Sequence, residues 1–111
     1  MSGRLPTHLE VAGWRRAVEG AGGFAAVLHR GDNEAGSILL LTIENGTNPR
    51  LWERMPQLDG SRVFTLVNAQ SIDNVVELST YLEKRTRQDS DLWIVELDIA
   101  APERFVELRQ D

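Results

Sequence analysis

The stretch "FAAVLHRGDNEAGSILLLTIENG", Phe24 to Gly46, decides the fold because two apolar runs flank a short polar segment. Phe24–His29 and Ser37–Glu44 have the length and composition of strands. The second run carries apolar side chains at successive positions, so both of its faces are apolar, as in a central strand. Asn45-Gly46 favours a two-residue hairpin turn. A third strand is therefore predicted near Arg50–Arg54.

The polar segment between the two runs is interpreted as the connection of a hairpin. Gly31 and Gly36 give the backbone freedom, and Asp32 forms side-chain-to-backbone turns. The spacing fails for a calcium loop, which needs a glutamate at position 12, and for a phosphate loop, which needs a lysine after its second glycine. A second possibility stays open, in which Arg30 and Asp32 contact an anionic ligand.

Five further elements follow from periodicity and turn residues. A helix is predicted over Thr7–Glu19, with Thr7 and Glu10 at the spacing of a capping box. The other predicted elements are a strand at Arg62–Val67, a helix from Ser71 to about Thr86, and strands at Leu92–Asp98 and Arg104–Leu108. The order αββββαββ predicts a single α+β domain over residues 1–111. It has a mainly antiparallel sheet of about five to six strands, with two helices packed on one face.

Composition excludes several classes of function. The 111 residues carry 12 basic and 17 acidic side chains, a net charge of −5, which opposes binding to nucleic acid or anionic membranes. The chain has no cysteine, so it has no disulfides, thiolate zinc sites or cysteine nucleophiles. The N-terminus lacks the apolar segment of a signal peptide, and the longest apolar run, Ile38–Leu41, is too short to span a bilayer. We expect a soluble cytosolic protein without a membrane partner.

Three blocks of the sequence resemble a known family. They are "GGFAAVLHRGDNEAGSILL", then "LW" followed by Pro56, and "YLEKRTRQDSDLWIVEL". Together they resemble the mostly alphaproteobacterial family catalogued as domain of unknown function 1491, whose members are about this length. Two departures show: His29 stands where a second arginine is common, and Gln88 and Ser90 replace the usual phenylalanine and proline. The resemblance supports an α+β fold and implies no activity, cofactor or catalytic residue.

No catalytic or metal-binding pattern emerges from the remaining residues. A nuclease metal site would need a lysine two residues after Glu96, where Asp98 stands. His8 and His29 have no metal-binding or triad spacing, and no serine lies in a nucleophile elbow. We therefore expect no catalytic residues, no metal and no cofactor.

Arg50, Trp52 and Arg54 are the strongest candidates for an interaction surface. Alternation places them on one face of a strand, and tryptophan and arginine dominate interface energetics. The favoured hypothesis is a non-enzymatic binding module for an unknown protein partner or for a second copy of the chain, acting through these residues and an exposed sheet edge.

The alternative is a protein that binds a small molecule, a nucleotide or another anion through the Arg30/Asp32 loop and the Asp91/Glu96 strand. Such a protein could also be an enzyme. If that loop and strand are neighbours, Arg30 is expected either to pair with Asp91 or Glu96 or, at a ligand site, to stay unpaired and face a cavity. RNA binding ranks third.

Overall fold

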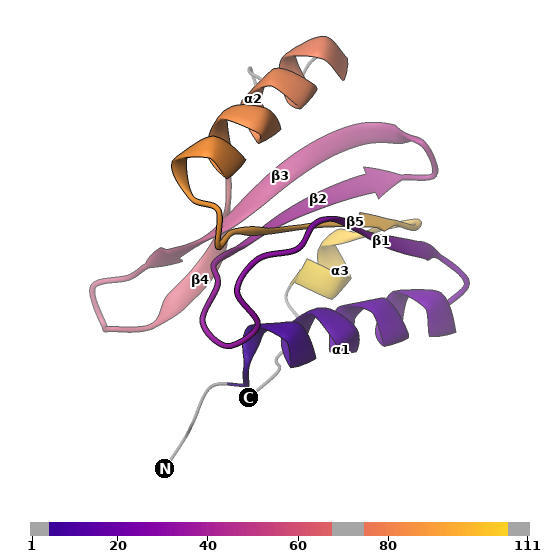
Figure 1. The fold of residues 1–111 in the computed structure, drawn as a ribbon. Coiled ribbons are helices and arrows are strands. Elements are labelled where there is room, and N and C mark those ends of the chain that lie inside the picture. The colour runs from indigo at the N-terminus through magenta and orange to yellow at the C-terminus, as the bar shows by residue number, and fades with distance from the viewer. Residues whose placement is uncertain (1–4, 68–74, 107–111) are drawn as a thin grey trace.

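The computed structural model describes residues 5–67 and 75–106, which form a five-stranded sheet with helices on both faces (Figure 1). The elements are α1 (Thr7–Gly20), β1 (Phe24–His29), β2 (Ile38–Glu44), β3 (Thr47–Pro56), β4 (Arg62–Leu66), α2 (Val75–Gln88), β5 (Trp93–Asp98) and α3 (Glu103–Val106). The α+β class is confirmed, and so is the element order up to β5. The predicted start of the second helix, Ser71, lies outside the described residues.

The strand order is β1-β5-β2-β3-β4, so β5 lies between the two strands of the opening stretch. Val95 of β5 is paired with Val27 in an antiparallel ladder and with Leu40 in a parallel one. The predicted hairpin between β1 and β2 is therefore wrong, and the sheet is mixed. The central position of β2 is confirmed. Its apolar side chains face both ways because helices cover both faces.

The second hairpin is confirmed. β2 and β3 are antiparallel neighbours, and Asn45 and Gly46 between them have φ values of 52° and 85°. Positive φ at both central residues is the conformation of a type I′ turn, which matches the twist of the flanking strands. β3 then pairs with β4, so the chain from Ile38 to Leu66 is an antiparallel meander.

The helices do not lie on one face, contrary to the prediction. Figure 1 shows α1 and α3 below the sheet and α2 above it. The lower core contains Val11, Trp14, Val18, Ile38, Leu40, Trp93, Val95, Leu97, Phe105 and Val106, with Trp52 and Phe64 packed against it. On the upper face, Tyr81 and Leu82 of α2 pack against Leu39 and Ile94. Burying both faces of β2 requires this three-layer arrangement.

The last predicted strand is also wrong. Glu103–Val106 is a short helix, α3, and the rest of the predicted strand lies outside the described residues. Phe105 and Val106 are consecutive and both are buried, which a strand with one solvent face does not allow. The indole Nε1 of the fully buried Trp14 donates to the carbonyl oxygen of Phe105 at 2.9 Å. This bond fixes α3 against α1.

The predicted capping box of α1 does not form. Thr7 Oγ1 donates to the carbonyl oxygen of Gly36 at 2.9 Å, and no side chain caps the helix, which Pro6 precedes. Glu10 points to β3, where it binds Arg54. The local signature is overridden because both side chains make contacts between α1 and segments far away in the sequence.

Candidate functional site

Arg50, Trp52 and Arg54 lie on the face of β3 that α1 and α3 cover. Trp52 packs against the lower core, and its Nε1 donates to Thr42 Oγ1 at 2.9 Å. The hydroxyl of Thr42 is fully buried, so this bond satisfies two polar groups away from solvent. Trp52 is therefore held in place by its own sheet.

Arg54 makes a two-pronged ion pair with Glu10 of α1. Its Nη2 lies 2.7 Å from Oε2 and its Nη1 lies 3.4 Å from Oε1. The two side chains are only 18% and 10% exposed, and the guanidinium also lies 4.7 Å from the ring centre of Phe64. An arginine in this position ties β3 and β4 to α1.

Arg50 makes a weaker contact with α3. Its Nη1 lies 3.3 Å from Glu103 Oε2, and both side chains are 39% exposed. Exposed ion pairs of this kind contribute roughly 0–1 kcal/mol to stability. The two predicted interaction arginines thus brace β3 against different helices, with very different degrees of burial.

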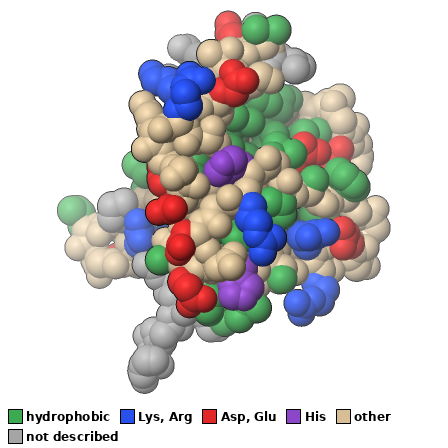
Figure 2. Space-filling view, in the orientation of Figure 1, with side chains coloured by type: hydrophobic (Ala, Val, Ile, Leu, Met, Phe, Trp, Pro, Cys, Tyr) green, Lys and Arg blue, Asp and Glu red, His purple; other side chains and the backbone are tan. Residues whose placement is uncertain are grey.

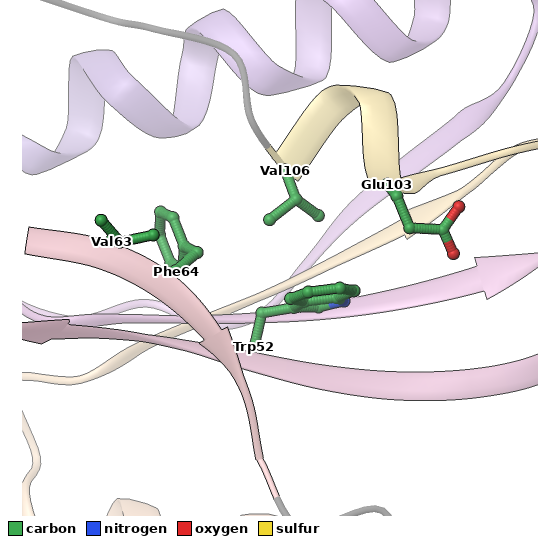
Figure 3. A pocket seen from close by; sticks show the side chains of 5 residues that line it. All are labelled: Trp52, Val63, Phe64, Glu103 and Val106. Atoms are coloured by element: carbon green, nitrogen blue, oxygen red, sulfur yellow. The ribbon is translucent and has the colours of Figure 1, made fainter.

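A small pocket lies on this face beside Trp52. Its volume is about 100 Å³, and its lining residues are Trp52, Val63, Phe64, Glu103 and Val106; we call it the Trp52 pocket. Figure 3 shows Val106 pointing at the indole ring, with Phe64 on one side and Glu103 on the other. Sequence reasoning identified Trp52 but missed the other four residues. The adjacent Phe105-Val106 pair after Pro102 was the signal that this segment is buried as a helix.

The outer edge of β4 borders the same pocket. In residues 5–67 and 75–106, the ladders place β4 next to β3 only. The amide of Val67 donates to Leu51 and that of Gln57 donates to Ser61, so the odd-numbered residues of this hairpin are hydrogen-bonded to each other. In an antiparallel ladder the alternate residues point their backbone groups outward. The N–H and C=O groups of Arg62, Phe64 and Leu66 therefore line the outer edge.

Large apolar side chains are exposed along this hairpin. Met55 and Val63, which are paired across the ladder, are 45% and 50% exposed, and Leu66 is 42% exposed. Leu58 at the tip of the hairpin is fully exposed. Among the residues that the structure describes, an unpaired backbone edge, exposed apolar side chains and a pocket thus coincide at β4.

The loop of Arg30 and Asp32 is fixed to the start of β5. The amide of Asp32 donates to the carbonyl oxygen of Asp91 at 3.0 Å, and the carbonyl of Asp32 accepts Trp93 Nε1 at 2.7 Å. The Asp32 carboxylate accepts the amides of Glu34 and Ala35, as the predicted turn chemistry requires. Gly31 is needed for packing, because a Cβ there would lie 2.0 Å from the Asp91 oxygen.

Arg30 is exposed and stacks on Trp93, with its guanidinium carbon 5.2 Å from the ring centre. Among the described residues it pairs with neither Asp91 nor Glu96. Figure 2 shows acidic side chains running down the face between α2 and α1. Asp32, Glu34 and Asp91 are exposed in this part of the chain, so an anion at Arg30 would meet negative charge.

The acids of the alternative hypothesis do not converge. Asp91 precedes β5 and Glu96 lies five residues further, a separation of about 17 Å along an extended strand. Burial raises the pKa of Glu96, and the negative charge of the neighbouring Asp98 raises this pKa to a smaller extent. In the described part of the chain, no three histidine or acidic side chains are placed to hold a metal ion, and no helix is long and apolar enough to cross a membrane.

Comparison with known proteins identifies the family of this chain. The family model described as "Protein of unknown function (DUF1491)" matches residues 5–107. The chain belongs to the DUF1491 family. None of the curated proteins matches it. The resemblance drawn from the sequence blocks is therefore confirmed, and the family description itself states no activity.

Solved structures share the fold of this protein over nearly the whole chain. A crystal structure of a family member from Caulobacter crescentus CB15 has a TM-score of 0.81 and 30% identity, covering 92% of this chain and 94% of that one. An NMR structure of a DUF1491 protein from the same organism has a TM-score of 0.79 and 29% identity, with 96% of each chain covered. The solution structure of protein Atu0922 from A. tumefaciens has a TM-score of 0.73 and 27% identity, with 98% of each chain covered.

Proposed function

We propose that this DUF1491 protein is a small non-enzymatic binding module that takes an extended segment of a protein partner onto the outer edge of β4. The observation that carries the proposal is the outward row of backbone groups at Arg62, Phe64 and Leu66. A free strand edge offers main-chain hydrogen bonds to an added strand, as in β-augmentation.

The composition of β4 supports this use of the edge. Proteins usually protect an edge strand with proline, a bulge or inward-pointing charges. β4 has the sequence Arg-Val-Phe-Thr-Leu, its ladder with β3 has no register shift, and its charge lies only at its first residue. Strand-forming residues without such protection favour pairing with another strand.

The alternative, a small-molecule, nucleotide or anion-binding protein, has less support. Sites for such ligands usually have volumes of roughly 300–1,000 Å³, so the Trp52 pocket, with about 100 Å³, is small for a ligand of this kind. Arg30 lies among acidic side chains, and Asp91 and Glu96 are far apart on β5. The location in the cytosol stays a prediction from the sequence, and the sequence names no partner.

The proposal is tested with Leu66→Pro. Proline at this position removes an outward N–H and no ladder hydrogen bond, which edge strands tolerate. The matched control is Phe24→Lys, which changes a 59% exposed residue of β1, the opposite edge of the sheet. Each protein is immobilised on a resin and incubated with native lysate. The captured partner is then purified, and hydrogen exchange is measured on its complex with the protein.

We expect wild type and Phe24→Lys to retain the same partner and Leu66→Pro to lose it. In the complex, the amides of Phe64 and Leu66 should gain protection from exchange, since they become donors to the added strand. A partner that binds Leu66→Pro as well as wild type would refute the proposal. A concentration-dependent dimer that Leu66→Pro abolishes would instead assign the edge to a second copy of the chain.

A further inference from the structure

The Trp52 pocket lies where side chains of a strand added to β4 would reach. This inference rests on the proposed function. A new strand would run about 4.8 Å beyond β4, with every second side chain on the face of α1 and α3. On that face, Leu66 lies opposite Trp52 and Phe64 lies opposite Arg54. The pocket is lined by Trp52 and Phe64 from these two pairs, so the nearest inward side chain of the added strand points toward it.

We propose that the pocket selects one branched aliphatic side chain of the added strand, and that Glu103 selects an arginine or lysine two residues away. The volume of about 100 Å³ suits a leucine, isoleucine or valine side chain. An enclosed cavity that holds a benzene ring has about 150 Å³, so the smaller volume of this pocket favours an aliphatic side chain over an aromatic one. The walls are the rings of Trp52 and Phe64 and the methyl groups of Val63 and Val106, which make no hydrogen bond with the occupant.

The second element of selection is the carboxylate of Glu103 at one side of the pocket. Its side chain is 39% exposed, and Oε2 accepts a single hydrogen bond from Arg50 at 3.3 Å. Oε1 makes no hydrogen bond with the described residues, and a carboxylate has about four acceptor positions. A cationic side chain of the partner therefore binds Glu103 without displacing Arg50.

The position of Glu103 fixes the spacing of the recognised segment. Arg50 and Trp52 are two residues apart on one face of β3, and α3 places Glu103 over Arg50 and Val106 over Trp52. Inward side chains of an added strand also repeat every two residues, about 7 Å. The recognised pattern is thus an aliphatic residue and a basic residue separated by one position.

The test uses NMR titration of the ¹⁵N-labelled protein with blocked heptapeptides of threonine that carry a central guest residue. We expect leucine as guest to bind at least about tenfold more tightly than alanine, because its three additional carbons are removed from water in the pocket. Phenylalanine should bind no better than alanine. Arginine placed two residues to either side of leucine should bind more tightly than glutamate there, by about fivefold.

Two variants separate the charge effect from a general loss of negative charge. Glu103→Gln should abolish the preference for arginine and keep the preference for leucine. Glu19→Gln, with the same charge change at an exposed position in the last turn of α1, should keep both preferences. Equal preferences in the two variants would overturn the role of Glu103.

The outcomes also separate this inference from the proposed function. If peptides with every guest residue shift the amide signals of Phe64 and Leu66 and bind with equal affinity, the inference is overturned and strand addition stays in place. Peptides that shift neither amide, together with a partner that still binds Leu66→Pro, would overturn the proposed function. Signal shifts confined to the Trp52 pocket in Leu66→Pro would overturn the inference as stated, since the side chain would then bind without an added strand.

Discussion

Replacing Arg54 with methionine tests whether this arginine stabilises the fold or is available to a partner. Methionine keeps an unbranched apolar stem and removes the guanidinium that stacks on Phe64. The change leaves the Glu10 carboxylate, which is 10% exposed, without its cation. Breaking a buried ion pair costs about 3–5 kcal/mol. The partial exposure of this pair reduces the expected loss to about 2–3 kcal/mol.

The assay is urea denaturation followed by circular dichroism, with thermal melting as a second measure. For a chain of this length, each kcal/mol corresponds to about 4 °C in Tm, so Arg54→Met should melt about 8–12 °C below wild type. Arg50→Met is the matched control, since Arg50 lies on the same face of the same strand but its pair with Glu103 is 39% exposed on both sides. Its expected cost is at most about 0.5 kcal/mol.

A double-mutant cycle with Glu10→Gln isolates the interaction itself. We expect a coupling energy of about 2 kcal/mol between Glu10 and Arg54, because the two side chains share two hydrogen bonds. A coupling below about 0.5 kcal/mol, or equal costs for Arg54→Met and Arg50→Met, would refute the reasoning. Arg54 would then be free to bind a partner, as the sequence pattern suggests.

Three further perturbations have expected outcomes. Gly31→Ala should destabilise by about 1–3 kcal/mol in thermal melts, since its Cβ would meet a backbone carbonyl at 2.0 Å, whereas Gly20→Ala, with nothing within 4 Å, should not. Arg85→Met removes two hydrogen bonds to a β3 carboxylate at 2.9 and 2.8 Å, so amides of α2 should exchange faster while those of β5 keep their protection. Burial raises the pKa of Glu96, so the folded state holds the carboxyl proton more tightly than the unfolded state does. The stabilisation that this proton provides is complete at low pH and is lost as pH rises through the raised pKa. Glu96→Gln should therefore raise Tm at pH 7 but not at pH 3.

Periodicity and turn residues predicted most of the elements, because these signals are local. β1 has the predicted bounds, Phe24–His29, and β2 begins one residue after the predicted Ser37. The Asn45-Gly46 turn was predictable because few residue pairs accept positive φ at both positions. The insertion of β5 between β1 and β2 was not predictable. It depends on contacts across more than fifty residues, such as the amide of Trp93 donating to Ser37 at 2.8 Å.

The candidate site shows the same division between local and distant contacts. The alternation of Arg50, Trp52 and Arg54 correctly placed the three side chains on one face of a strand. It could not show that α1 and α3 cover this face, because Glu10 and Glu103 lie about forty to fifty residues away from their partners in the sequence. Val106 was assigned to a strand and Glu103 to no element, so the predicted elements did not bring the residues of the Trp52 pocket together.

The position of the proposed binding edge follows from the contacts that these side chains make inside the molecule. Arg54 is bound to Glu10 and Trp52 to Thr42 inside the molecule. Of these two side chains, a partner can therefore reach only the part of Trp52 that lines the pocket. β4 differs, because its ladder with β3 satisfies alternate backbone groups and leaves the others at the edge. Such groups bind water or another strand. The interaction surface that we propose thus lies one strand away from the predicted one, at the backbone of β4 and not at the side chains of β3.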